Sequence, residues 1–313
     1  MTRSLLMPTR RSTANKLKKP LQCLLVFLFL LSGTLYYYVK GETDAPGFSD
    51  WVDEYIPDGM EVHFLDVGQG SSTLLLCGES AVLVDGGEYE NGFDIVSYLK
   101  HHGVEKLDLL VATHNHSDHI GGLIVVLQKM TVNEVLLNGS TAETTDTQSE
   151  NEFTSRLLFN GAIATTAEAE MVYEFSGMQI SVLQANNDSA DENENSIVLR
   201  ADFENTSVLL TGDIGNETEN ELINIGVNLD CDILQAAHHG SNHSNSADFI
   251  VQTSPSIAVI SCGENNIYNH PGEDSLHRLR QANTAVYRTD VMGTIVFACN
   301  DNNIKIISDG KEE

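Results

Sequence analysis

The chain has 313 residues, 41% of them hydrophobic and 20% charged, which is enough for one large domain or two small ones with a hydrophobic core. Its 17 Lys and Arg residues stand against 45 Asp and Glu residues, and seven of the basic residues lie in the first forty positions, which contain no acidic residue. The remainder carries ten basic against 45 acidic residues, a balance that argues against capture of polyanions by bulk electrostatic attraction.

The first forty residues read as a unit of their own. Residues 1–20 are basic, and residues 21–39 carry no charge over a length that spans a bilayer as a helix. Basic residues before such a segment stay cytoplasmic, and three tyrosines at residues 36–38 suit the far interface. This pattern predicts an uncleaved signal-anchor in the cell membrane with the acidic body outside the cytoplasm. A cleaved signal peptide, which would release the body, is the alternative.

Residues 41–58 form an acidic linker, and the domain is expected to occupy residues 59–310. Short runs rich in Val, Leu and Phe, each ended by a turn residue, predict strands; in the first half they lie at residues 60–68, 71–78, 80–87 and 106–113. Helical spacing predicts two helices, at residues 92–103 and 121–130, the first with Phe93, Ile95, Val96 and Leu99 on its apolar face. Polar composition predicts loops at residues 139–152 and 185–195.

The second half continues in the same alternation. Apolar runs predict strands at residues 196–203, 206–213, 231–241, 255–263, 285–290 and 293–299, and helices are expected at residues 217–226 and 275–283. Many strands and few long helices indicate an α/β fold, with two sheets packed as a sandwich and covered by helices. Five cysteines without a C-x-x-C pair exclude a cysteine zinc knuckle and are expected to be buried free thiols.

The stretch THNHSDHIGG, residues 113–122, follows the strand at residues 106–113 directly and carries His114, His116, Asp118 and His119. Neutral imidazoles and carboxylates are ligands for Zn²⁺, Mn²⁺ or Fe²⁺. On an extended backbone His114 and His116 point the same way, and Asp118 and His119 then turn toward a second position. One irregular loop can therefore supply ligands to two metal ions, and the two glycines that follow would let the next helix approach closely.

Further candidate ligands recur where other predicted strands end. They are Asp85 in VLVDGG, Asp213 in LLTGD, and His238 or His239 in QAAHHGS. An aspartate before glycine is usually a turn residue, so each is weak alone. Together with the histidine stretch they form one constellation at a sheet edge.

The motif H-x-H-x-D-H resembles the signature of metallo-β-lactamase-fold hydrolases. FLDVGQGSSTLL, VLVDGG, NSIVLRADFENTSVLLTGD, AAHHGSNHS and NNIYNHP are similar, in this order, to segments of the extracellular hydrolase-like domain of the competence ComEC family of DNA-uptake channel proteins. The resemblance covers about residues 60–310 and implies a four-layer αββα sandwich. The ComEC family also resembles surface phosphorylcholine esterases of the same fold.

The resemblance also implies roles for the candidate residues. His114 and His116 would bind a first metal ion, Asp118 and His119 a second, and Asp213 would bridge the two. His238 or His239 would complete the second site, and the other would meet a substrate phosphate. Asp85 would hold the histidine loop from behind.

Two departures from the pattern stand out. Many members of the fold place a further histidine before the strand that leads to Asp213, but this chain has Asn195 and Ser196 there. The first metal ion would then be more weakly held, or completed by water or Asn195, which brings in Mn²⁺ as an alternative to Zn²⁺. Relatives often have aspartate where this chain has Ser71.

These residues predict a metal-dependent phosphodiesterase, in first place a DNA nuclease in which a metal-bound water acts as hydroxide. His238, His239 or His270 could hydrogen-bond a phosphoryl oxygen or protonate the leaving group, although His270 is equally well explained as a turn residue. A phosphodiesterase of choline-bearing or other cell-wall polymers is the runner-up, and an inactive domain that binds DNA or protein is the non-enzymatic alternative. Three arginines, Arg278, Arg280 and Arg288, offer a local positive track or simply an ordinary surface.

Overall fold

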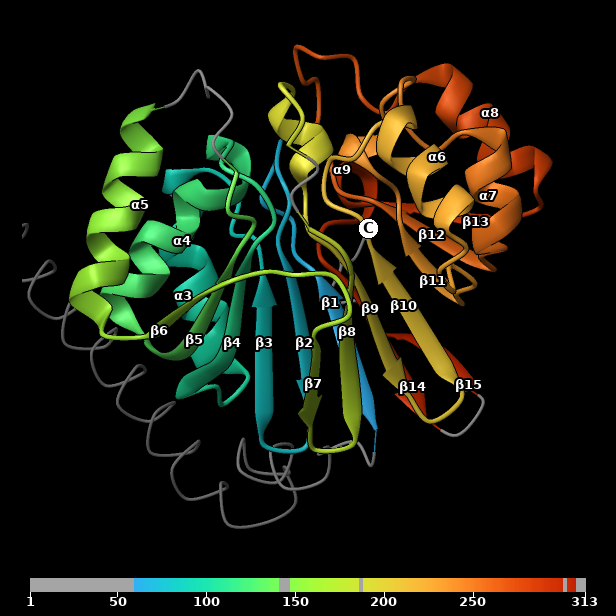
Figure 1. The fold of residues 1–313 in the computed structure, drawn as a ribbon. Helices are drawn as coiled ribbons and strands as arrows, with labels where there is room; N and C mark the ends of the chain where they lie inside the picture. The colour runs from blue at the N-terminus through green and yellow to red at the C-terminus, as the bar shows by residue number, and fades with distance from the viewer. Residues whose placement is uncertain (1–58, 141–146, 186–187, 301–302, 308–313) are drawn as a thin grey trace, which may run out of the picture. The chain divides into compact units, whose positions relative to one another are not determined.

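The computed structural model describes residues 59–140, 147–185, 188–300 and 303–307 (Figure 1). The chain divides into two compact units, Met1–Ile56 and Pro57–Glu313, and all described residues belong to the second. The segments predicted at residues 1–20, 21–39 and 41–58 lie outside the described residues and stay predictions. Within the described ranges, no helix combines the length and the apolar character needed to cross a membrane.

The first sheet has eight strands. In their spatial order they are β15 (Asn303–Ile307), β14 (Ile295–Asn300), β1 (Met60–Phe64), β2 (Thr73–Cys77), β3 (Ser80–Val84), β4 (Lys106–Ala112), β5 (Thr131–Leu137) and β6 (Ile163–Thr166). The strands from β3 to β6 run parallel, and the others pair antiparallel. Parallel neighbours bring their carboxyl ends to one edge of the sheet, which matters for the site below.

The second sheet has seven strands. In their spatial order they are β13 (Ala285–Arg288), β12 (Ile257–Ile260), β11 (Ile233–Gln235), β10 (Thr206–Leu210), β9 (Val198–Phe203), β8 (Met178–Gln184) and β7 (Val172–Phe175). The strands from β10 to β13 run parallel. Each sheet therefore contributes one parallel half, whose strand ends carry loops.

Helices cover both outer faces (Figure 1). On the first sheet lie α3 (Gly92–His101), α4 (Ser117–Lys129) and α5 (Thr147–Asn160); on the second lie α6 (Asn216–Ile225), α7 (Ala247–Thr253) and α8 (Glu273–Gln281). The short helices are η1 (Tyr89–Asn91), η2 (Glu192–Asn195), η3 (His238–Gly240) and α9 (Thr289–Met292).

The main core lies between the two sheets, because alternate strand residues point to opposite faces. Leu75 and Val111 of the first sheet and Leu199 and Leu210 of the second belong to one buried cluster. The intervening residues, such as Leu74 and Leu110, pack instead against α3 and α4. The predicted α/β sandwich of two sheets covered by helices is confirmed.

Three local predictions were wrong. The helix expected to begin at Gly121 begins at Ser117, so Asp118 and His119 lie in the first turn of α4 rather than in a loop. The helix dipole favours a negative side chain in the first turn, so Asp118 stabilises a helix start at this position. The loop expected at residues 139–152 becomes α5 from Thr147 onward. Phe93 is 55% exposed, and Gly92 packs on α4 in its place.

The close approach predicted for Gly121 and Gly122 is confirmed. A β-carbon on Gly121 would lie 2.5 Å from the amide nitrogen of Tyr89, and one on Gly122 would overlap the carbonyl oxygen of Gly86. The Gly122 N–H donates to the Gly87 carbonyl at 2.9 Å. The N-terminal part of α4 therefore lies in direct contact with the turn that follows β3, and this contact sets where His119 lies.

Gly122→Ala should lower the free energy of unfolding by about 3 kcal/mol, because backbone atoms on both sides must move. Gly226→Ala is the matched control, since that glycine ends α6 with φ +73° but has no atom within 4 Å of an added β-carbon. It should cost only about 1 kcal/mol for the left-handed backbone. Urea unfolding of both variants measures the two values; equal losses would contradict the steric argument.

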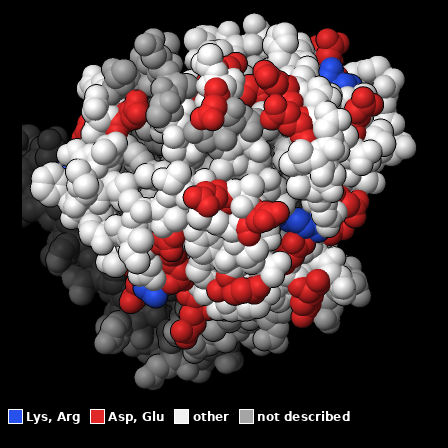
Figure 2. Space-filling view, in the orientation of Figure 1, with Lys and Arg blue, Asp and Glu red and all other residues white. Residues whose placement is uncertain are grey.

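The four described cysteines, Cys77, Cys231, Cys262 and Cys299, are buried and unpaired. Burial raises the pKa of the Cys231 thiol to about 12, so it is not a ready nucleophile. Acidic side chains are spread over the face of the molecule seen in Figure 2, with few Lys or Arg between them. The view agrees with the excess of acids in the sequence and offers no basic track on this face.

Candidate metal centre

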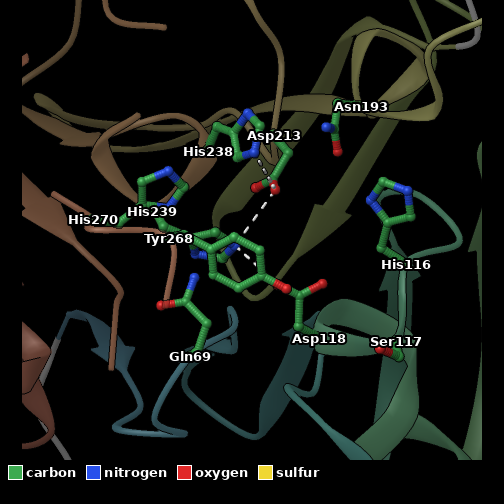
Figure 3. A pocket seen from close by; sticks show the side chains of 10 residues that line it. All are labelled: Gln69, His116, Ser117, Asp118, Asn193, Asp213, His238, His239, Tyr268 and His270. Atoms are coloured by element: carbon green, nitrogen blue, oxygen red, sulfur yellow. Dashed lines mark ion pairs between the residues drawn. The ribbon is translucent and has the colours of Figure 1, made fainter. Parts of the chain in front are cut away.

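The predicted ligands meet where parallel strands of both sheets end. Asp85 follows β3 and His114 follows β4, while Asp213 follows β10 and the His238–His239 pair follows β11. Of these residues, Asp213, His238 and His239 line an open pocket of about 240 Å³ (Figure 3), whereas Asp85 and His114 are not among its lining residues. The pocket is lined by Gln69, His116, Ser117, Asp118, Asn193, Asp213, His238, His239, Tyr268 and His270.

His114 and His116 face each other as the period-two spacing predicts. The Nε2 atom of His114 lies 3.1 Å from Nδ1 of His116. The Nδ1 atom of His114 lies 3.2 Å from the Thr113 hydroxyl and 3.3 Å from the Ser196 hydroxyl. Burial and the nearby charge of His119 hold the pKa of His114 well below its ordinary value. His114 is thus neutral, with a lone pair available for a cation.

Asp85 holds the histidine segment from behind. Its carboxylate accepts hydrogen bonds from the Thr113 backbone N–H at 2.9 Å, the Thr113 hydroxyl at 2.8 Å and Nδ1–H of His119 at 2.7 Å. Asp85 is fully buried and has φ +60°. With its Nδ1 committed, His119 presents Nε2 toward Asp213, 3.3 Å from Oδ1. This is the contact that the resemblance implies for Asp85.

His239 is fixed in a similar way. Its Nδ1–H donates to the Ser261 carbonyl at 2.9 Å. Its Nε2 lies 3.2 Å from Oδ2 of Asp118 and 3.4 Å from Oδ2 of Asp213. His238 is more open, with a side chain 28% exposed and its Nε2 3.8 Å from Asp213. Of the two alternatives, the geometry places His239 among the ligand atoms and His238 at the pocket wall.

The donor set fits one or two divalent cations. His114, His119 and Asp213 offer three atoms within 4.8 Å of one another, and so do Asp118, His119 and His239. His119 belongs to both groups, whereas the resemblance assigned it to the second ion alone. The Nε2 atoms of His119 and His239 are buried without a hydrogen-bond partner. Burying such atoms unpaired costs free energy, and a shared cation would remove that cost.

Without a cation these groups hold charges of opposite sign. Burial alone would lower the pKa of His119 and His239, but the nearby carboxylates, Asp213 first, raise the pKa of His119 well above its ordinary value and that of His239 to about 10. Burial alone would raise the pKa of Asp213, but the imidazoles, His239 first, hold it well below its ordinary value. The metal-free site is therefore a network of imidazolium and carboxylate groups at pH 7.

Metal binding at pH 7 should release about two protons per chain, one each from His119 and His239. The sign follows from their raised pKa values, because both imidazoles are protonated at pH 7 and must lose a proton to coordinate. Affinity should then rise with pH up to about 10, the pKa of His239. Calorimetry of Zn²⁺ or Mn²⁺ binding in buffers of different ionisation enthalpy counts the protons. Release of none would contradict this arrangement.

The Asn195 side chain hydrogen-bonds away from the ligand groups, so of the two alternatives for completing the first metal site, water or Asn195, the geometry favours water. Its side chain accepts from the Ser189 backbone N–H at 2.9 Å and donates to the Ser140 hydroxyl and the Ser189 carbonyl. It is buried inside its own loop, which its hydrogen bonds close. Ser196 instead touches the site, since its hydroxyl accepts the Asp213 backbone N–H at 3.1 Å.

Three glutamates that the sequence analysis did not single out brace the ligand loops. Glu192 is buried and accepts the backbone N–H of Asn115, between the first two histidines, at 3.0 Å. Glu194 accepts the N–H of Gly215, just after Asp213, at 3.1 Å. Glu219 accepts two N–H groups of the loop that follows the His238–His239 pair. Nothing in an acidic stretch such as DENEN distinguishes these braces from solvated carboxylates.

The pocket wall contains both expected and unexpected residues. His270 lines it, and burial together with the charge of His239 lowers the pKa of His270 to about 4. Gln69, Asn193 and Tyr268 also line it and were not predicted. Sequence order could have suggested Tyr268, which stands in the NNIYNHP motif beside His270.

Two of the three arginines suggested as a positive track, Arg278 and Arg288, bind groups of the protein itself. Arg278 donates to backbone carbonyls between residues 242 and 245, and Arg288 pairs with Asp290 at 2.5 Å. Ser71, where relatives often have aspartate, accepts a hydrogen bond from Gln235 at 2.7 Å below the site. The suggested arginine track is therefore not formed by Arg278 and Arg288.

Comparison with known proteins agrees with this geometry. Residues 65–163 match the family model described as the metallo-beta-lactamase superfamily. ComE operon protein 3 of Bacillus subtilis (strain 168) is 31% identical over 257 residues, covering 76% of this chain and 33% of that protein. Competence protein ComA of Neisseria gonorrhoeae is 32% identical over 263 residues, covering 83% of this chain and 35% of that protein. The chain spans about a third of the length of these curated relatives.

Among solved structures, the metallo-β-lactamase-fold protein YhfI from Bacillus subtilis aligns with a TM-score of 0.52 at 14% identity. The alignment covers 77% of this chain and all of that one. At this identity the likeness shows the fold alone, which is the two-sheet sandwich described above.

Proposed function

Since this chain carries a metallo-β-lactamase-superfamily domain similar to part of the ComEC-family competence proteins, we propose that it is a divalent-metal-dependent hydrolase of phosphodiester bonds, with DNA as its substrate. The observation that carries the proposal is the pair of overlapping ligand groups beside an open pocket, in which two buried imidazole nitrogens face carboxylates without forming a hydrogen bond. Such a donor set beside an open space suits a catalytic metal ion.

His114, His116, Asp118, His119, Asp213 and His239 would hold one or two ions, either Zn²⁺ or Mn²⁺. A bound ion of this kind supplies Lewis acidity and lowers the pKa of a water molecule to about 7. The chain contributes the alignment of the ligands, because Asp85 and the Ser261 carbonyl fix the rings of His119 and His239. That fixed geometry is what lets a site act on charge that develops at phosphorus.

His238 and His270 line the pocket beside the ligand groups, with ring centroids 5.5 Å apart. Both could hydrogen-bond a phosphoryl oxygen, and His238 could act as the general acid that protonates the leaving oxygen. Asp118 lies at the rim of the second ligand group, with its side chain 22% exposed. It could align a water molecule for attack as well as hold an ion.

The choice of DNA rests on the competence relatives, whose match extends over most of this chain. We also propose that residues 21–39 anchor the protein in the membrane with the domain outside the cytoplasm, where incoming DNA would be met. The excess of acidic residues supports local contact at the pocket rather than capture of long duplexes along the surface.

A second candidate is a phosphodiesterase of choline-bearing polymers. The acidic surface and the exposed ring of Tyr268 at the pocket favour it, because a quaternary ammonium group binds aromatic faces and is drawn to negative charge.

The test uses the full chain, stripped of metal and reloaded separately with Zn²⁺ or Mn²⁺. Single-stranded DNA, double-stranded DNA and p-nitrophenyl phosphorylcholine are assayed side by side. Metal-dependent shortening of DNA would support the nuclease and show which ion serves it. Release of nitrophenol without DNA cleavage would favour the choline-polymer enzyme. If the metal-loaded protein cleaves none of the three substrates, an inactive binding domain is favoured.

A further inference from the structure

A tyrosine at the pocket and the isoleucine before it in the chain are both exposed. Tyr268 is 60% exposed and lines the pocket (Figure 3). Ile267 is 86% exposed and is not among the lining residues. Neither side chain belongs to a core cluster among the described residues. The exposed aromatic face of Tyr268 at the pocket is therefore free to stack on a planar group of a bound ligand.

The loop that carries Tyr268 is held in place. The Asn266 side chain donates to the carbonyls of Gly263 and His270 at 2.9 and 2.6 Å and accepts the His270 backbone N–H at 2.9 Å. The Gly263 N–H in turn donates to the Gln69 side chain at 3.2 Å. The ring is thus carried by a loop that hydrogen bonds hold in place, so ligand binding would cost little conformational entropy for ordering this loop.

Three aromatic rings of the site, those of His239, His270 and Tyr268, lie in sequence with similar orientations. His270 lies nearly parallel to His239, with an angle of 28° and centroids 6.1 Å apart. Tyr268 lies nearly parallel to His270, with an angle of 26° and centroids 5.8 Å apart. One side of the Tyr268 ring faces His270, and its exposed part offers the next place in the series to another planar group.

The rest of the pocket narrows the choice of that group. No Lys or Arg is among the lining residues, so the chain itself offers no cationic side chain there for the phosphates of a long strand. The cavity of about 240 Å³ is small, so a polymeric substrate would place only a small part of its length inside it. Stacking, which needs no charge on the protein, is the interaction by which proteins hold unpaired bases.

We propose that Tyr268, flanked by Ile267, forms a base-stacking subsite that makes this hydrolase select an unpaired nucleotide next to the scissile phosphate. The inference rests on the proposed function and deepens it by naming single-stranded nucleic acid as the substrate class. Tyr268 acts here as a specificity residue, because its ring contacts the base and takes no part in bond cleavage.

The test compares two esters with the same leaving group, thymidine 5′-(p-nitrophenyl phosphate) and methyl p-nitrophenyl phosphate, on the metal-loaded full chain. Tyr268→Ala should lower kcat/KM for the thymidine ester by about 5- to 150-fold, the range for loss of one stacked base, mainly through KM. The methyl ester should change less than about twofold. Tyr268→Phe, which keeps the ring, should retain the preference for thymidine.

Tyr89→Ala is the matched control, since Tyr89 is a partly exposed tyrosine absent from the pocket lining, and it should leave both esters unchanged. Equal losses on both esters, or no loss on either, would overturn the subsite. So would a loss confined to p-nitrophenyl phosphorylcholine, which would assign the ring to a cationic head group.

A binding readout separates this inference from the proposed function. Fluorescence anisotropy of a labelled oligothymidylate measures affinity without turnover. If the unaltered protein cleaves neither ester but binds the oligomer, and Tyr268→Ala weakens that binding, the subsite stands and the hydrolase fails. If the oligomer binds equally to both proteins, or to neither, the subsite is wrong.

Discussion

Replacing Asp213 with asparagine should lower kcat/KM for a phosphodiester by about 10³-fold or more while leaving the fold intact. The carboxylate is 4% exposed, and its two oxygens lie 3.3 Å from His119 and 3.4 Å from His239. Asp213 belongs to the first ligand group, and its contact with His239 links it to the second. Loss of bridging charge at such a site removes several kcal/mol of transition-state stabilisation, equivalent to this factor.

The fold should survive because Asp213 contacts the site and not the core between the sheets. Without the carboxylate the neighbouring imidazoles lose the largest of the charges that raise their pKa, but His119 keeps Asp85 and His239 keeps Asp118, so neither ring is left as an unpaired buried charge. Turnover, metal content and far-UV circular dichroism are measured together. Asp202→Asn is the control, since that carboxylate pairs with Arg200 on β9 outside the pocket. Full activity of the Asp213 variant would disprove the site.

Alanine at His239 and at His238 should have different consequences, although the two residues are adjacent in the chain. His239→Ala should lose bound metal and about 10³-fold in turnover, because its buried Nε2 lies between the carboxylates of Asp118, at 3.2 Å, and Asp213, at 3.4 Å. His238→Ala should keep its metal and lose about 10²-fold, the range for a group that transfers a proton or contacts substrate.

The difference arises from the turn that the two residues share. Both have φ +53°, but the His239 ring is held at Nδ1 by the Ser261 carbonyl, and its Nε2 lies closer to the carboxylates than that of His238. Metal content by atomic emission and kcat at saturating substrate separate the two outcomes. The reverse order, with metal lost from the His238 variant alone, would exchange the two roles.

Much of the fold was readable from local patterns. The strands and several helices follow from short apolar runs closed by turn residues, because a half-buried strand and a helix face each impose their own spacing. The helix start at Ser117 was missed because the His-rich stretch looks like a loop until α4 is docked on the turn at Gly86. The start of α5 was missed because its first turn is polar on every side.

The candidate ligands were also readable, since His114, His116, Asp118 and His119 occur in one compact motif. Asp85, Asp213 and His239 stand out only as polar residues after apolar strands, and they meet because parallel strands of two sheets end at one edge. Asn195 stayed open as an alternative to water because the chain alone does not reveal that its amide closes a loop.

The α/β class, the ligand chemistry and the imbalance of charge follow from residue type and spacing along the chain. Three features become visible only in the folded chain: which histidine of the pair joins the carboxylates, that Glu192, Glu194 and Glu219 brace the loops, and that Tyr268 lines the pocket. Each of these depends on burial and on contacts between residues far apart in the chain, and an isolated residue letter carries neither.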